Sequence, residues 1–296
     1  MRISVCITTR NRPEALDACL KALWDSTTKP NLVIVSDDSL IEEIQQINSG
    51  IVSKYPGTKY ILGPRIGVCG NRNNAVNAIP SSETDFVAFV DDDICVEPNF
   101  LTQAREIYQK MSVEEQQHTI LSGVSRNPQG KEEMVAGELN FRGYFRVTEN
   151  SPQTVAIHAT LFPRVFFEQE QWDENIFFGY EDAELSLRAL QRGYKIKHCP
   201  ELKVIHPGEN GVSVLDIPDM GTLTNYEISI EAARLYVGIK RYKDLFPSPF
   251  KLIIFLITYF VHMTVYLFRR RTIQALPEIV RRSRIHKLWQ QPSLSI

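Results

Sequence analysis

Three consecutive aspartates, Asp91, Asp92 and Asp93, directly follow the apolar stretch at residues 86–90. Carboxylate oxygens bind hard divalent cations, which in turn hold substrate phosphates. Three adjacent carboxylates also repel one another strongly unless a cation lies among them. A solvated acidic turn has the same composition, but the residues before it have the character of a buried strand whose polar end is this cluster. The pattern therefore favours a divalent-metal site.

A second group of candidate residues lies at positions 67–74, where a glycine-containing loop leads into a helical pattern. Free backbone N–H groups at a helix start can bind a diphosphate, and Arg72 would add a cationic partner. An ordinary loop with a surface arginine has the same character, so this segment alone does not decide the function.

Aromatic residues precede paired acids at positions 177–184, again at the expected start of a helix. A carboxylate there, such as Glu181 or Asp182, is stabilised by the helix dipole. A simple N-terminal cap explains these acids as well as a catalytic role does. The catalytic alternative is that an acid beside an aromatic wall acts as a general base toward an acceptor hydroxyl.

His206 follows the apolar pair at residues 204–205 and precedes a proline, so we expect it at the end of a strand. Most lone histidines are structural or surface residues. A neutral imidazole can nonetheless complete a metal site that carboxylates begin.

The elements that must position these groups alternate in type over the first hundred residues. Short apolar runs at residues 3–7, 32–35, 60–62 and 86–90 are typical of strands, and helical patterns separate them. This alternation indicates parallel strands with crossover helices, so we predict an α/β layer fold. The helix expected from Pro13 onward has an apolar face made of Leu16, Cys19, Leu20 and Leu23.

The polar clusters at residues 8–11, 37–38 and 91–93 all come just after expected parallel strands. Ligands of open α/β sheets bind at the carboxyl ends of the strands, so we expect these clusters at one binding edge. The middle of the chain is less regular, with antiparallel strands expected around residues 121–125 and 155–162. A helix is predicted at residues 180–192, closed by Gly193.

Composition sets limits on the class of protein. The chain has 296 residues, 43% of them hydrophobic, which is enough for one large core and excludes a disordered or fibrous protein. A net charge of -2 gives no reason to expect a nucleic-acid partner. The five scattered cysteines indicate neither disulfides nor structural zinc, and the N-terminus does not have the pattern of a secretory signal. We therefore expect the globular part in the cytoplasm.

In this order, the segments resemble the family 2 glycosyltransferases, whose catalytic domain has the GT-A fold. The resemblance covers about residues 1–210, and the ordered set of motifs is far more specific than any single motif in it. The motifs are Ser4-Val5-Cys6-Ile7-Thr8-Thr9-Arg10-Asn11-Arg12-Pro13, Ser36-Asp37-Asp38-Ser39, Arg72-Asn73, Asp91-Asp92-Asp93 and Glu181-Asp182. The stretch at residues 179–188, followed by 193–194 and 204–206, looks like the galactofuranosyl- and rhamnosyltransferase branch.

The resemblance implies a GT-A type fold, with a mixed, mostly parallel central sheet flanked by helices. It also implies a nucleotide-sugar donor site lined by Thr8, Arg10, Asp37, Asp38, Arg72, Asp91 and Asp92, with Arg72 at the diphosphate. Asp91 and Asp93 would form the DxD-type metal site, in which Asp93 and His206 bind a Mn²⁺ or Mg²⁺ ion that bridges the donor phosphates. One departure is Asn74, where many members have glycine, which leaves the backbone approach there in doubt.

By the same resemblance, Asp182 is the base that activates the acceptor, and a single displacement inverts the anomeric carbon. The expected acceptor is a glycan or a lipid-linked glycan in cell-surface polysaccharide or glycolipid biosynthesis. Two alternatives remain at this point. One is another metal-dependent nucleotide transferase, such as a nucleotidyltransferase, and the other is an inactive membrane-bound scaffold of GT-A shape.

A run of about twenty mostly apolar residues at 250–268 is close to the length that spans a bilayer. A buried core helix has the same pattern. Basic residues flank the run on both sides, with a cluster at residues 269–271. A donor-using domain faces the cytosol, and a single span would then carry this cluster outward, against the positive-inside rule. We therefore prefer a helix in the cytosolic leaflet of the cell membrane to a single-pass span.

The expected organisation follows from these patterns. Residues 1–215 form the catalytic domain, with a nucleotide-sugar-binding half at 1–110 and an acceptor-binding half at 111–215. Residues 216–249 form a helical connector. Residues 250–296 form the apolar helix and a basic tail that associate with the membrane.

Overall fold

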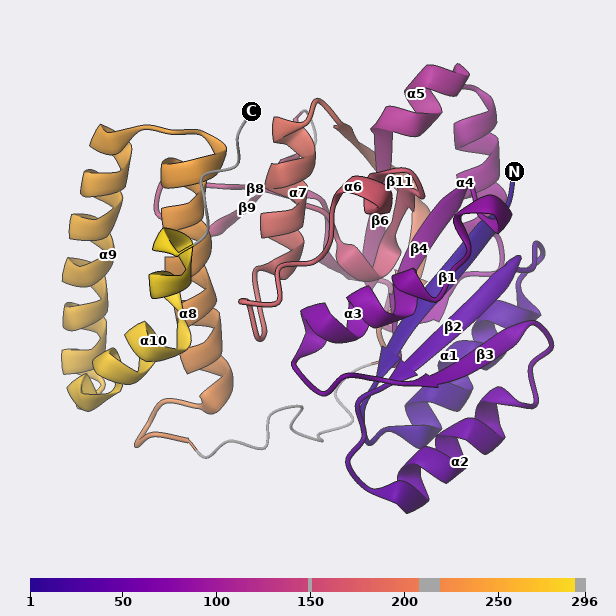
Figure 1. Cartoon of the computed structure of the whole chain (residues 1–296), viewed down its shortest axis with the longest axis horizontal. Coiled ribbons are helices and arrows are strands. Elements are labelled where there is room, and N and C mark those ends of the chain that lie inside the picture. The colour runs from indigo at the N-terminus through magenta and orange to yellow at the C-terminus, as the bar shows by residue number, and fades with distance from the viewer. Residues whose placement is uncertain (149–150, 208–218, 291–296) are drawn as a thin grey trace.

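The computed structural model describes residues 1–148, 151–207 and 219–290 of the chain. Its centre is a mixed sheet with strand order β3-β2-β1-β4-β10-β6-β11-β5, and β7 pairs with β6 outside this path (Figure 1). The first four strands are mutually parallel. They are β1 (Ile3–Thr9), β2 (Leu32–Asp37), β3 (Thr58–Leu62) and β4 (Phe86–Asp91).

Crossover helices connect these parallel strands, as the alternation in the sequence predicts. They are α1 (Pro13–Asp25), α2 (Glu42–Val52) and α3 (Val68–Asn77), and a short 3-10 turn η1 (Ser81–Glu83) precedes β4. Pro13 is the first residue of α1, where its missing N–H costs nothing. The predicted apolar face of this helix is completely buried against the sheet, so that expectation is confirmed.

The second half of the sheet is mixed. Strand β10 runs antiparallel to both β4 and β6, whereas β11 runs parallel to β6 and antiparallel to β5. The bounds are β5 (Cys95–Val96), β6 (Thr119–Arg126), β7 (Glu132–Met134), β10 (Thr160–Pro163) and β11 (Lys195–Ile205). The strand predicted around 155–162 begins later, because a 3-10 turn η2 (Ile157–Ala159) precedes β10. This arrangement is the α/β fold of GT-A type that the resemblance implied.

Helices and a hairpin complete this half of the chain. They are α4 (Phe100–Gln109), α5 (Val113–His118), α6 (Phe166–Gln169), α7 (Glu181–Gln191) and the hairpin β8 (Gly137–Leu139) with β9 (Phe145–Val147). Helix α7 matches the helix predicted at residues 180–192. Gly193 follows it at φ +85°, a left-handed conformation that glycine adopts without strain.

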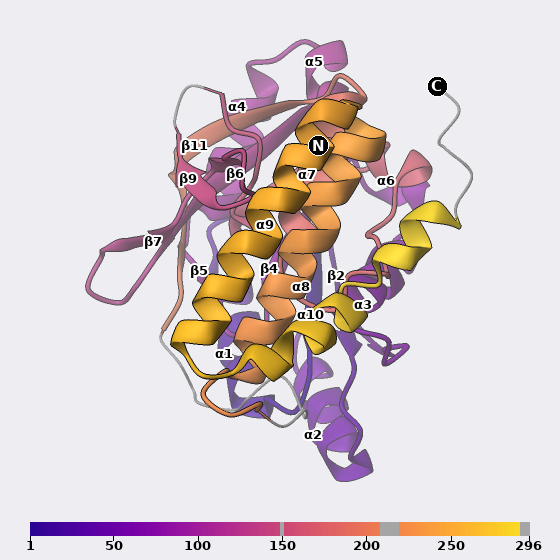
Figure 2. The ribbon, with the colours of Figure 1, turned by 90° about the vertical axis from the view of Figure 1, so that its left-hand side faces the viewer.

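The C-terminal part forms helices that pack side by side against one flank of the sheet domain (Figures 1 and 2). Their bounds are α8 (Asn225–Lys240), η3 (Arg241–Leu245), α9 (Pro249–Arg269), η4 (Ile273–Ala275), α10 (Leu276–Arg282) and η5 (Ile285–Trp289). Helices α8 and α9 approach closely at Gly238, where an added Cβ would lie 2.1 Å from the Phe255 ring. The expected boundary at residues 215–216 lies outside the described residues.

A buried ion cluster attaches α8 to α7. The Lys240 ammonium lies 2.6 Å from a carboxylate oxygen of Asp173 and 2.6 Å from one of Glu184. Glu184 also pairs with Arg188 at 2.6 Å on the same helix. Breaking such a buried pair leaves an uncompensated charge, which costs about 3–5 kcal/mol. The C-terminal helices are therefore held to the element that carries Asp182.

Helix α9 has two apolar faces, and the protein covers one of them. Phe255, Tyr259, Met263 and Leu267 recur every four residues and are buried toward the protein. The opposite face leaves large apolar side chains 46–75% exposed, at Phe250, Ile253, Ile257, Val261, Val265 and Phe268. In the described part of the chain, α9 is the one helix long and apolar enough to cross a membrane.

Candidate active site

The predicted polar clusters meet at the carboxyl edge of the parallel strands. Thr8 on β1 is in register with Asp91 on β4, and its neighbour Thr9 is in register with Asp37 on β2. This register follows from the parallel pairing, since all three strands end at the same edge. The sheet thus brings together residues that are up to about eighty positions apart in the sequence.

Asp37 and Asp38 occupy different environments. Asp37 is fully buried, and its carboxylate accepts hydrogen bonds from Asn48 Nδ2, the Tyr60 hydroxyl and the Ser39 backbone N–H, each at 2.8 Å. Its oxygens therefore hold the turn after β2. Asp38 accepts from the Arg65 backbone N–H at 2.9 Å, and burial raises the pKa of its carboxyl while the nearby Arg10 charge opposes that rise.

The aspartate triplet also separates in space. Asp92 is buried and accepts a hydrogen bond from the Thr9 hydroxyl at 2.7 Å, and burial raises its pKa to about 7. Asp93 is more exposed, and its Oδ2 accepts from Arg12 Nη1 at 2.7 Å. The three carboxylates point to three different sets of partners, so their mutual repulsion is partly relieved by Arg12.

Arg72 is buried between two acids. One guanidinium nitrogen lies 3.1 Å from Asp91 Oδ1 and another lies 3.0 Å from Glu181 Oε1. The guanidinium also stacks 4.9 Å from the centre of the Trp172 ring. Burial alone lowers the pKa of Arg72, but the two carboxylates raise it above its usual value. Arg72 thus joins the end of β4 to the start of α7.

His158 lies on the other side of Asp91. Its Nδ1 is 3.7 Å from Asp91 Oδ2. Burial raises the pKa of Asp91, but Arg72 and His158 together lower it well below its usual range, so Asp91 is ionised. The His158 side chain is buried, and its Nε2 has no hydrogen-bond partner among the described residues.

Asp182 lies in the first turn of α7, after Tyr180 in the left-handed conformation at φ +61°. Its Oδ1 accepts from the Ala183 backbone N–H at 2.7 Å. Burial raises the pKa of its carboxyl to about 7, and the neighbouring Glu181 charge adds to the rise. A carboxylate with a pKa near neutral can both accept and release a proton at working pH.

Asp93 and His206 meet where β11 pairs with β5. The two side chains lie 3.7 Å apart, between His206 Nε2 and Asp93 Oδ2, and each is about 30% exposed. A carboxylate and an imidazole are suitable ligands for Mn²⁺. Asp91 points instead to Arg72 and His158, and no group of three His, Cys, Asp or Glu side chains converges on a metal position within residues 1–148, 151–207 and 219–290. The donor set fits a divalent cation at Asp93 and His206.

Sequence reasoning gave no role to two residues that the structure brings into this site. Arg12 pairs with Asp92 and Asp93, and His158 contacts Asp91. Glu181 was a candidate acid, but its pairing with Arg72 was not expected. A signal existed for Arg12, because it follows β1 at the predicted binding edge. His158 had none, since the 3-10 turn that directs its side chain is not visible as a pattern.

The family model of the glycosyl transferase family 2 matches residues 4–169. Among solved structures, the chain resembles a mannosyltransferase from Pyrobaculum calidifontis in complex with GDP-Man and Mn²⁺, with TM-score 0.59 and 13% identity over 98% of this chain and 88% of that one. It also resembles TarS of S. aureus in complex with UDP-GlcNAc, with TM-score 0.57 and 17% identity over 97% and 84%. Comparison with curated protein sequences gives no match.

These structural likenesses show the fold, since all are below 20% identity. The chain spans 37% of a longer TarS structure, with TM-score 0.52 and 18% identity over 70% of this chain. The family model, in contrast, matches more than half of this chain and includes the carboxyl edge with its aspartates. The chain therefore belongs to the family 2 glycosyltransferases and is a glycosyltransferase of GT-A fold.

Proposed function

We propose that this protein transfers a sugar from a nucleotide-sugar donor to a hydroxyl of a glycan or lipid-linked acceptor, with inversion of the anomeric carbon. The observation that carries the proposal is the position of Asp182. Its carboxyl has a pKa near 7 and directly follows Glu181, which the Arg72 bridge joins to Asp91 at the strand edge. The base and the donor edge thus share one connected site.

Donor binding is assigned to the edge formed by β1, β2 and β4. We propose that Thr8, Arg10 and Asp38 line the nucleotide pocket, with the buried Asp37 fixing the turn beside it. Two structural neighbours, in complex with UDP-GlcNAc and GDP-Man, bind a nucleotide sugar on the same fold. Arg72 is close enough to Asp91 to exchange a carboxylate partner for a donor phosphate, since guanidinium groups bind both in the same fork geometry.

A divalent cation, Mn²⁺ or Mg²⁺, is assigned to Asp93 and His206, with Asp91 and Asp92 toward the donor. When bound, it would neutralise negative charge on the departing nucleoside diphosphate. The mannosyltransferase neighbour carries Mn²⁺, which supports this choice. Arg12 also supplies positive charge beside Asp93.

Asp182 is the proposed general base. A base on the acceptor side removes the proton from the attacking hydroxyl, and a single displacement then gives inversion. Aromatic residues closely precede Asp182 in the chain, and the ring of Tyr180 packs 4.8 Å from the ring of Phe145. An apolar environment raises the pKa of a carboxyl, as required of a base near neutral pH.

We also propose that α9 lies along the cytosolic surface of the membrane rather than spanning it. One face of the helix is buried against the protein from Phe255 to Leu267, so lipid would contact only the opposite face. The exposed face is apolar, and Lys251, Arg269 and Arg271 flank it. This placement favours a lipid-linked acceptor, in cell-surface polysaccharide or glycolipid biosynthesis.

The domain organisation proposed from the sequence is compatible with this function. Residues 1–215 carry donor, metal and base, residues 216–249 connect, and residues 250–296 contact the membrane. The buried Lys240 cluster joins the connector to α7, so the membrane contact and the base belong to one packed unit.

The test is donor binding and hydrolysis across a panel of nucleotide sugars, with and without Mn²⁺, for wild type and Asp93→Ala. Metal-dependent use of one donor, lost in the variant, is the expected result and names the sugar. Release of pyrophosphate in place of a nucleoside diphosphate would support nucleotidyl transfer. Binding of no donor would leave the inactive scaffold as the better description.

A further inference from the structure

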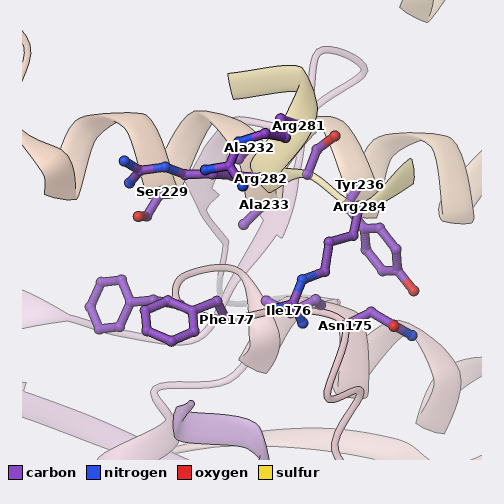
Figure 3. Close-up of a pocket in the computed structure, with 12 residues that line it drawn as sticks. Asn175, Ile176, Phe177, Ser229, Ala232, Ala233, Tyr236, Arg281, Arg282 and Arg284 are labelled. Carbon is purple, nitrogen blue, oxygen red and sulfur yellow. The ribbon is translucent and has the colours of Figure 1, made fainter. Parts of the chain in front are cut away.

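A cavity of about 250 Å³ lies between the sheet domain and the C-terminal helices, apart from the donor edge. Its walls come from the loop that precedes α7, from one face of α8 and from the end of α10 (Figure 3). Ligand pockets are usually about 300–1,000 Å³, so this cavity suits part of a ligand, such as one phosphorylated group.

The wall formed by the end of α10 is strongly basic. Arg281, Arg282 and Arg284 all line the cavity, and no carboxylate does so among the described residues. Glu278 is the carboxylate that pairs with Arg281 and Arg282, each at 2.6 Å, so the three arginines exceed their acid by two charges. Arg284 Nη1 donates a hydrogen bond to the Glu174 carbonyl oxygen at 3.1 Å.

These arginines differ in how available they are. Arg282 is mostly buried and also donates to Asn225 Oδ1, so it serves the packing of α10 on α8. The Arg281 side chain is 72% exposed. Arg284 reaches from its helix end across the cavity toward Asn175 and Ile176 (Figure 3). Arg281 and Arg284 are therefore the groups that an incoming anion meets.

The opposite wall is aromatic. Phe177 lies below the arginines (Figure 3). Phe178 also lines the cavity, and its ring lies 5.6 Å from the ring of Tyr226 on α8. Flat apolar rings pack against the C–H faces of a sugar or against an isoprenoid chain. The two walls together match a ligand with an anionic group next to an apolar or sugar portion.

The cavity is continuous in sequence with the proposed base. Phe178 and Asp182 are four residues apart, so their Cα atoms are at most about 15 Å apart. The backbone of Phe177 also packs on Gly67, where an added Cβ would lie 3.0 Å from its carbonyl oxygen. A molecule seated in the cavity can therefore extend toward Asp182. On the other side, α10 follows directly from the apolar α9.

We propose that this cavity binds a phosphate or diphosphate group of the acceptor through Arg281 and Arg284, with Phe177 and Phe178 against the adjoining sugar or isoprenoid. The inference rests on the proposed transfer reaction and deepens it, because it states that the acceptor is a phosphorylated molecule. Guanidinium groups are suited to phosphate by their charge and bidentate geometry. Two sources share this chemistry, a lipid-linked diphosphate and a free phosphate group on a glycan.

The experiment measures binding of farnesyl diphosphate and of inorganic pyrophosphate to the full-length protein by calorimetry. EDTA is present, because it removes the metal that would hold a diphosphate at the donor edge. Wild type is compared with Arg281→Gln/Arg284→Gln. The matched control is Lys54→Gln/Lys59→Gln, which removes two positive charges near α2 and β3 on the opposite side of the molecule (Figure 1).

The expected result is at least about tenfold weaker binding of farnesyl diphosphate in the arginine variant, with the lysine control equal to wild type. An equal loss for pyrophosphate points to a phosphate group alone, whereas a loss confined to farnesyl diphosphate points to a lipid-linked acceptor. Binding that is the same in both variants, or absent in wild type, overturns the inference.

Donor hydrolysis by the same wild-type preparation with Mn²⁺ separates this inference from the function on which it rests. If wild type uses a donor but the arginine variant binds both probes normally, the cavity assignment alone is wrong. If wild type uses no donor, the transfer reaction is wrong, whatever the arginines bind. Circular dichroism of each variant verifies that the fold is retained.

Discussion

Replacing Asp182 by asparagine should abolish activity and at the same time stabilise the protein at alkaline pH. The pKa of this carboxyl is about 7 in the folded protein, against an ordinary value of 3.8. The folded state therefore favours the protonated form, and ionisation of Asp182 costs stability as pH rises from about 4 to about 7. At about 1.4 kcal/mol per pH unit, the full cost is at most about 4 kcal/mol above pH 7.

Asparagine has no charge, so Asp182→Asn avoids this cost. The gain in unfolding free energy should be about 3 kcal/mol larger at pH 8 than at pH 5, because the wild-type carboxyl is mostly protonated in the fold at pH 5. Transfer should fall by about 10²–10⁴-fold, the usual contribution of a general base. Denaturant unfolding at the two pH values, together with a donor-transfer assay, measures both effects.

Glu184 on the same helix is the matched control, because the pKa of its carboxyl is shifted in the opposite direction. Burial raises its pKa, but Arg188 and Lys240 lower it below the ordinary value. Its ionised form therefore stabilises the fold, and this stability is present above the unfolded-state pKa and lost at lower pH. Glu184→Gln should destabilise the protein by about 3–5 kcal/mol at pH 8. The reasoning is refuted if Asp182→Asn lowers stability at pH 8 or if transfer survives.

Three other predictions concern separate parts of the molecule. Arg72→Met should lower the unfolding free energy by about 3–5 kcal/mol, because it leaves the buried Glu181 without its cation; a loss below about 1 kcal/mol in denaturant unfolding would contradict the bridge. Asp93→Ala should remove Mn²⁺ binding measured by electron paramagnetic resonance, and unchanged affinity would place the metal elsewhere. Ile257→Glu on the exposed face of α9 should weaken sedimentation of the protein with anionic lipid vesicles and leave the melting temperature unchanged. Met263→Glu on the buried face should prevent folding. Vesicle binding that survives Ile257→Glu would argue against the surface orientation.

The parallel half of the fold could be predicted from the sequence because its signals are local. Continuous apolar runs at β1, β2 and β4 are typical of strands buried on both faces, and the polar residues after them mark the binding edge. Helix α1 had a complete pattern, with proline at its start and an apolar stripe. The second half had weaker signals, since β5 has only two residues and is stabilised by pairing with β11 rather than by its own sequence.

The residues of the site were easier to find than their partners. Residue type and place identified Asp91 at a strand end and Asp182 at a helix start. Nothing in the sequence indicated that Arg72 would pair with Glu181, which is 109 residues away. Contacts of this kind depend on how α3 packs against the start of α7. The same limit applies to α9. Its composition fits a membrane span equally well, and the burial of one of its faces depends on how it packs on α8, which the sequence does not show.

The charges around Arg72 explain why Asp182, and not a neighbouring acid, is suited to act as the base. The Arg72 guanidinium lies near the carboxylates of Asp91, Glu181 and Asp182. Of these three, it pairs with Asp91 and Glu181. Asp91 has the further positive influence of His158, and its pKa is low. Burial raises the pKa of Asp182 to about 7, and the neighbouring charge of Glu181 adds to the rise. Within the described ranges, no Lys or Arg forms an ion pair with Asp182. Arg72 therefore keeps the donor-side acid ionised and leaves the acceptor-side acid able to take up a proton near neutral pH.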